Sequence, residues 1–97
     1  MAAFSFLTNH GLALVCIAAD PRARIRDIAA AVGITERTAQ RLVADLVEAE
    51  YIGCTREGRR NVYATRMDLA IRLPAQRDVD LGSLLRVLLP EERGGAF

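Results

Sequence analysis

Apolar and polar residues follow one another along the chain in a pattern that predicts helices separated by short breaks. The first apolar run, Leu12 to Ala19, has no polar interruption, which predicts a helix that is buried on every side. Thr8 or Asn9 is placed to cap its start, and Asp20-Pro21 ends it, because proline disfavours helical geometry in the residue before it. A chain of this length has little material to surround such a helix, so we expect one of its faces to contact a second subunit.

The next segment predicts two helices joined by a tight turn. Residues 24–26 alternate between polar and apolar, which suits a very short strand or an extended entry. A short helix is expected over residues 27–32, and a second helix over residues 35–49. Gly33 supplies the left-handed conformation of the turn between them, and Thr35 is a good N-cap for the second helix.

The helix over residues 35–49 has two distinct faces when positions are counted at 100° per residue. The inward face holds Ala39, Leu42, Val43 and Leu46, with Glu50 at its end. The outward face carries Glu36, Arg37, Gln40, Arg41, Ala44, Asp45 and Glu48. Its first half is mostly basic and its second half is acidic, so only the first half suits contact with phosphates.

A hairpin and a leucine-rich helix are predicted in the rest of the chain. Strand-favouring residues lie on both sides of the segment 56–61, which has Gly58 at its bend. Residues 67–79 contain Pro74 and scattered polar groups and are expected to form a loop. Asp80 caps a final helix that Pro90 ends.

These elements predict a mainly α fold with a small β-hairpin (α+β), in the order α-β-α-α-β-β-α, which is a winged helix-turn-helix. Residues 1–97 form a single domain in this interpretation. Its core spans about 5–66, a C-terminal dimerisation segment spans about 67–90, and the tail 91–97 is expected to fray.

The net charge of the chain says little about its partner, but the type of its basic residues is informative. The chain has 97 residues and a net charge of +1, and all 13 of its basic residues are arginine. A near-neutral net charge does not by itself indicate a nucleic-acid partner, but arginine suits bidentate contact with phosphate and guanine. The sequence shows no apolar run of about 18 residues and no secretory signal, so we expect a cytoplasmic protein with no membrane partner.

The sequence contains no motif that predicts catalysis or metal binding. Carboxylate pairs, Ser-His sets and phosphate-binding glycine loops do not occur at usable spacing, so we expect neither an enzyme nor a cofactor. His10 stands alone as a helix-start residue without a partner, so no metal site is expected. Cys16 and Cys54 are expected to be buried and inert, with a redox-sensing role as the alternative.

One stretch of the sequence resembles a known family. Residues 25–52 read IRDIAAAVGITERTAQRLVADLVEAEYI, and EGRRNVY follows soon after. Over residues 6–65 the chain resembles small prokaryotic winged-helix transcriptional regulators of the MarR-like group, and more closely a short single-domain family in which LTNH opens the first helix. The sequence departs from this pattern at Glu50, where the family has glycine. Since glutamate tolerates a left-handed cap poorly, we expect the helix to end differently there and the wing angle to shift.

The resemblance implies a homodimer that binds double-stranded DNA, with the second motif helix in the major groove and the hairpin wing on the backbone or minor groove. Arg37, Gln40 and Arg41 are the candidates for base edges, and Glu36 is placed either to accept from a cytosine amine or to discourage wrong contacts. Hydroxyl and wing contacts to the backbone are expected from Thr35, Thr38, Arg56, Arg59, Arg60 and Asn61. Arg22, Arg24 and Arg26 either contact the flanking backbone or pair with Asp20 and Asp27.

The apolar residues near both ends predict the subunit interface. It would consist of Phe4, Leu7, Leu14, Ile17, Leu84, Leu85 and Leu88. Alternatively, the final helix folds back onto its own first helix. The sequence favours a DNA-binding regulator, acting as a repressor, over a winged-helix module that binds another protein. It shows no ligand residues for a small-molecule effector.

Overall fold

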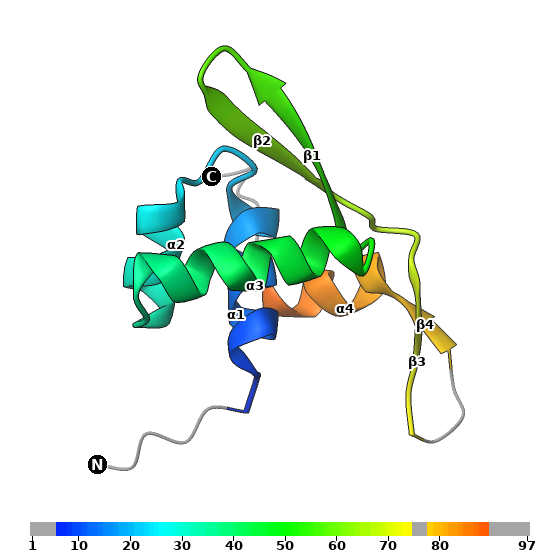
Figure 1. Ribbon diagram of the computed structural model, residues 1–97. Coiled ribbons are helices and arrows are strands. Elements are labelled where there is room, and N and C mark those ends of the chain that lie inside the picture. Colours follow the sequence, from blue (N-terminus) through cyan, green and yellow to red (C-terminus); the bar gives the residue numbers. More distant parts are fainter. Residues whose placement is uncertain (1–5, 75–77, 90–97) are drawn as a thin grey trace, which may run out of the picture.

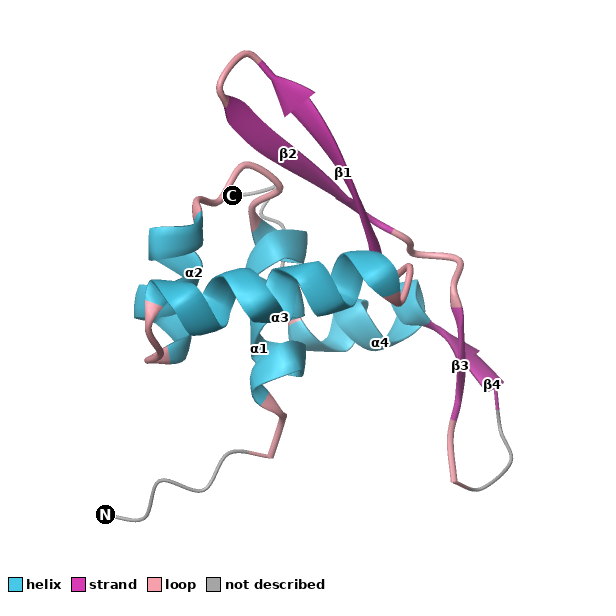
Figure 2. Cartoon of the chain, in the orientation of Figure 1, coloured by secondary structure: helices cyan, strands magenta, loops and turns pink. Residues whose placement is uncertain are grey.

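The described part of the chain folds into four helices and two antiparallel hairpins (Figures 1 and 2). The computed structural model describes residues 6–74 and 78–89. In chain order the elements are α1 (Asn9–Ala19), α2 (Ile25–Val32), α3 (Glu36–Glu48), β1 (Ile52–Glu57), β2 (Arg60–Thr65), β3 (Ala70–Arg72), β4 (Asp78–Asp80) and α4 (Leu81–Leu88). Three helices followed by a hairpin wing form a winged helix, which confirms the predicted α+β fold.

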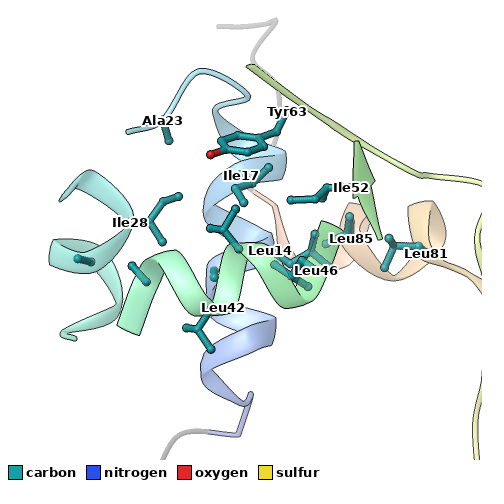
Figure 3. Packing of buried hydrophobic residues seen from close by; sticks show 14 residues of the cluster. Leu14, Ile17, Ala23, Ile28, Leu42, Leu46, Ile52, Tyr63, Leu81 and Leu85 are labelled. Carbon is teal, nitrogen blue, oxygen red and sulfur yellow. The ribbon is translucent and has the colours of Figure 1, made fainter. Parts of the chain in front are cut away.

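The core lies where α3 crosses α1, with α2 and α4 packed on either side (Figures 1 and 3). Its largest fully buried side chains are Ile17, Ile28, Ile52, Leu81 and Leu85. These five come from α1, α2, β1 and α4, and buried residues of α3 such as Leu42 and Leu46 pack with them, so one apolar cluster joins all four helices to the start of the wing. The inward face predicted for α3 is buried as expected.

Polar side chains set the starts of three helices. Thr8 accepts a hydrogen bond from the backbone N–H of Gly11 at 3.1 Å, which begins α1. Thr35 caps α3, as predicted. The Asp80 carboxylate caps α4 by accepting from the N–H of Ser83 at 2.7 Å. Hydrogen bonding with the Ser83 side chain, together with this backbone bond, lowers the pKa of Asp80.

Glu50 ends α3 in the conformation that glycine normally supplies. Its φ is +68°, in the left-handed region. The Tyr51 N–H donates to the Leu46 carbonyl at 2.9 Å, and the Glu50 N–H donates to Val47 at 3.0 Å. These two bonds form a Schellman motif. The expectation that glutamate would end the helix differently is therefore wrong, because the paired backbone bonds hold the left-handed residue in place.

The short strand expected at residues 24–26 is absent. Arg24 is extended, but Ile25 already begins α2, which makes this helix two residues longer than predicted. A single strand-like bond remains upstream, where the Tyr63 N–H of β2 donates to the Pro21 carbonyl at 2.9 Å. One such bond attaches the linker between α1 and α2 to the wing without building a strand.

Residues 67–79 are not the loop that was predicted. Ala70–Arg72 (β3) and Asp78–Asp80 (β4) instead pair as an antiparallel hairpin, in which Ile71 lies opposite Val79. Strands of three residues are too short to show alternation in the sequence, and Pro74 hides the pattern further. Gly82, in the first turn of α4, donates its N–H to the Met67 carbonyl at 2.7 Å, and a Cβ at this position would lie 3.0 Å from that oxygen.

The last helix packs against α1 of its own chain, as the alternative interpretation had it. Leu14, Ile17 and Leu85 are consequently buried without a second subunit, so the predicted interface residues that the structure describes do not form one open surface. Leu7 and Leu88 are half-buried, and Leu84 is exposed. Phe4 and the tail 91–97 lie outside the described residues.

The length and hydropathy of the helices decide whether one of them could span a membrane. No helix within residues 6–74 and 78–89 is long and apolar enough to cross a bilayer.

Candidate nucleic-acid interface

The first half of α3 presents side chains that the rest of the described chain leaves unpaired. Arg37, Gln40 and Arg41 are exposed, and nothing within residues 6–74 or 78–89 forms a hydrogen bond or ion pair with their side chains. Glu36 is exposed in the first turn, where a negative charge is favourable. These groups can contact a ligand without breaking any internal bond.

Two threonine hydroxyls lie at the N-terminus of α3. Thr35 Oγ1 accepts from the Thr38 N–H at 3.1 Å and donates to Thr38 Oγ1 at 3.0 Å. Thr35 thus uses its hydroxyl proton internally, whereas Thr38 keeps its own proton for another acceptor. Of the two hydroxyls predicted to contact phosphate, Thr38 is the better placed donor, although its side chain is half-buried.

The second half of α3 is joined to α1 by a hydrogen bond between two side chains. His10 Nε2 lies 2.7 Å from Asp45 Oδ2, and both side chains are about half exposed. The expectation that His10 has no partner is therefore wrong. The two residues are 35 positions apart, and only the crossing of α1 and α3 brings them together.

The wing is a hairpin with a two-residue turn. Glu57 pairs with Arg60, which leaves Gly58 and Arg59 at the turn, and Gly58 has a φ of +63°. A positive φ at the first turn residue matches the twist of the two strands. Arg59 and Asn61 are exposed, and Arg56 Nε donates to the Gly58 carbonyl at 3.4 Å.

Arg22 braces this wing from the linker between α1 and α2. Its Nη2 donates to Glu57 Oε1 at 2.7 Å, and its backbone carbonyl accepts from Arg60 Nη2 at 2.7 Å. Arg22 therefore pairs with neither Asp20 nor Asp27 through its side chain, contrary to one of the two alternatives. Arg60 is half-buried and supports the wing, in addition to any contact it makes with DNA.

Sequence analysis missed this brace because its partners are far apart in the chain. Arg22 and Glu57 are separated by 35 positions, and no local pattern marks them. The one sequence signal is the acidic Glu57 in an otherwise basic turn, since such a charge needs a nearby cation.

A cleft of about 240 Å³ separates the wing from the start of α2. Arg24 and Ile25 line it on one side, and Arg59, Arg60 and Asn61 line it on the other. The cleft brings three predicted wing residues next to Arg24, which makes this part of the surface more basic than the net charge of the chain suggests.

The cysteines differ from each other in exposure. Cys16 is half-buried in α1, and burial raises the pKa of its thiol. Cys54 is exposed on β1, so the expectation that both thiols are buried is wrong for this residue. Among the residues that the structure describes, no three His, Cys, Asp or Glu side chains gather as a metal site would require.

The comparison with protein families agrees with this geometry. Residues 9–52 match a family described as winged helix-turn-helix DNA-binding. The match runs from the first residue of α1 to the first residue of β1, and so includes the exposed face of α3 but little of the wing. Neither the curated proteins nor the solved structures returned a match. The matched segment supports a helix-turn-helix of the DNA-binding type.

Proposed function

We propose that this protein is a sequence-specific regulator of transcription that binds double-stranded DNA as a homodimer. In this proposal α3 enters the major groove and the wing lies on the backbone or in the minor groove. The observation that carries the proposal is the unpaired set Arg37, Gln40 and Arg41 on the leading half of α3. Arginine can bind guanine and glutamine can bind adenine through two hydrogen bonds each.

The shape of the wing supports a second contact with DNA. Arg59 and Asn61 are exposed near the turn, and Arg22 holds the turn end of the hairpin against the linker between α1 and α2. A wing held in this way can reach phosphates or the minor groove beside the helix. Binding at a promoter blocks polymerase without any further surface, so a small protein of this design suits a repressor. Within this class, the sequence resemblance favours the MarR-like prokaryotic regulators.

A homodimer would give the protein the specificity that one small domain lacks. Two copies of α3 would contact half-sites about 34 Å apart on one face of the duplex. The exposed apolar residues of α4 support such an association, because Leu84 and Val87 are 43% and 80% exposed.

Fluorescence anisotropy with a labelled duplex of mixed sequence tests DNA binding without knowledge of the operator. We expect binding that weakens steeply between about 50 and about 200 mM salt, with each neutralised phosphate contributing about 0.9 to the slope of log K against log salt. No binding at the lowest salt would overturn the proposal and favour a module that binds another protein.

Substitutions on α3 and the wing test which residues contact the DNA. Arg59→Ala should reduce the salt slope by about 1, since it removes one phosphate contact. Arg37→Ala should weaken binding at a selected operator by about 1–3 kcal/mol when it contacts a base. Arg72→Ala is the matched control, because Arg72 is an exposed arginine on the other hairpin. An equal effect of all three substitutions would contradict this placement of the site.

A further inference from the structure

A second cavity lies away from the leading half of α3 and the wing. It has a volume of about 460 Å³, opens to solvent, and is lined by the start of α1, the end of α3, β3 and the first turns of α4. Small-molecule sites in proteins occupy about 300–1,000 Å³. This hollow is therefore large enough for a compact ligand, and its walls are mainly apolar, formed in part by Leu14, Leu46, Ile71 and Leu81.

The one acidic side chain in the lining of this cavity is Asp45, among the residues that the structure describes. His10 and Asp45 line it, with His10 Nε2 at 2.7 Å from Asp45 Oδ2. Among the described residues that line the cavity, Asp45 is the only acid, and no arginine is present. Asp45 Oδ2 is occupied by His10, but a carboxylate has a second oxygen with free lone pairs, and the side chain is half exposed.

We propose that this cavity binds a small apolar amine. The apolar part of the ligand would lie among the leucine side chains, and its ammonium group would donate to the free oxygen of Asp45. A carboxylate ligand is disfavoured, because its charge has the same sign as the one acid in the wall and no arginine compensates it. This site does not depend on DNA binding, so its failure would leave that part of the proposed function untouched. Leu84, which lines the cavity, also belongs to the exposed apolar side of α4.

Three probes with the same apolar part and different head groups test the proposal on the whole chain. Phenylbutylamine, phenylbutanol and phenylbutyrate are titrated at about pH 8, where the amine is cationic and the acid anionic. Amide chemical shifts in ¹H–¹⁵N NMR spectra report where each probe binds. We expect saturable shifts at Gly11, Leu46, Ala49 and Leu81 with the amine, and binding at least about tenfold weaker with the acid.

Two variants of α3 assign the preference to Asp45. Asp45→Asn should abolish the difference between amine and acid while leaving weak binding of the alcohol in place. Glu48→Gln removes an acid on the same helix that does not line the cavity, and it should leave the preference unchanged. Because both substituted side chains are exposed, the variants are expected to fold, and their NMR spectra check this directly.

Several results would overturn the proposal. Equal affinity for amine and acid would contradict recognition of the ammonium group by Asp45. Chemical-shift changes that cluster elsewhere on the chain would show that the probe does not bind in this cavity. Absence of saturable binding would show that the cavity takes no such ligand. If the lining amides instead shift with protein concentration, a second copy of this chain covers the cavity and the amine site is wrong.

Discussion

At the scale of single residues, Glu50 has a backbone conformation that its side chain disfavours. A non-glycine residue in the left-handed region carries about 1–2 kcal/mol of strain, because its Cβ approaches the carbonyl oxygen that follows. The strain is offset because the backbone N–H groups of Tyr51 and Glu50 donate hydrogen bonds to the last carbonyls of α3. At this one position the hydrogen bonds that end the helix favour a left-handed backbone, whereas a residue with a Cβ disfavours it.

Glu50→Gly is expected to raise the free energy of unfolding by about 1 kcal/mol, since it relieves this strain at a position where glycine is the usual residue. Urea unfolding followed by circular dichroism measures the change. The control is Glu48→Gly, at the last helical residue of α3, which should lower stability by about 0.5–1 kcal/mol. If both glycines destabilise the protein equally, the strain at Glu50 is not significant.

The two thiols should react at different rates. Iodoacetamide attacks the thiolate, and Cys16 is half-buried with a raised pKa, whereas Cys54 is exposed. Mass spectrometry of the folded protein at about pH 8 should show alkylation of Cys54 well before Cys16. In urea the difference should disappear. Equal rates in the folded protein would mean that α1 opens readily.

At the scale of elements, the orientation of the wing depends on its contacts with the linker. Arg22 contacts Glu57 and Arg60, and the Tyr63 N–H binds the Pro21 carbonyl. The Arg22 and Glu57 side chains are both more than half exposed, so their ion pair contributes little to overall stability. Its effect is on the position of the hairpin rather than on whether the chain folds.

Arg22→Ala should therefore change the free energy of unfolding by less than about 1 kcal/mol but increase the mobility of the wing. Hydrogen exchange of the wing amides, measured by NMR, should become faster in this variant and in Glu57→Gln. The double variant should add little, because the two side chains act as a pair. Arg56→Ala is the control, since within residues 6–74 and 78–89 the Arg56 side chain bonds only to Gly58 in the adjoining turn. Unchanged exchange in Arg22→Ala would contradict the brace.

The helices were predictable from the sequence because each has a local signal. The period of Ala39, Leu42, Val43 and Leu46 predicts the buried face of α3, and Gly33 predicts the turn before it. The hairpin of β3 and β4 could not be predicted, because three-residue strands carry no period. Contacts such as His10 with Asp45 depend on how helices cross, and no short pattern encodes a crossing.

At the scale of the whole molecule, α4 carries two of the large apolar side chains that the described chain leaves exposed. Val87 is 80% exposed on α4, and Leu84 on the same helix is 43% exposed. Leu85, between them, is fully buried. The outer side of α4 is thus a candidate for a subunit contact, and it differs from the predicted interface by including Val87 and leaving out the buried leucines.

Val87→Asp is expected to weaken self-association by about tenfold or more, because it places a charge in an apolar contact. Sedimentation equilibrium over a range of concentrations measures the change. Val47→Asp, which alters an exposed valine on α3, should leave self-association unchanged. Circular dichroism confirms that both variants fold. A wild-type chain that stays monomeric at the highest concentration would disprove the homodimer.

The position of α4 in the chain also has a consequence for synthesis. Leu81 and Leu85 are among the largest fully buried side chains, and they complete a core whose other members all precede them. While a ribosome is making the protein, the motif helices and the wing emerge first, and the apolar side of α1 stays in water until residues 81–88 follow. A domain folds as a unit only when its core residues are all present. Chains released before that point would expose this apolar side and be prone to aggregate or to be degraded.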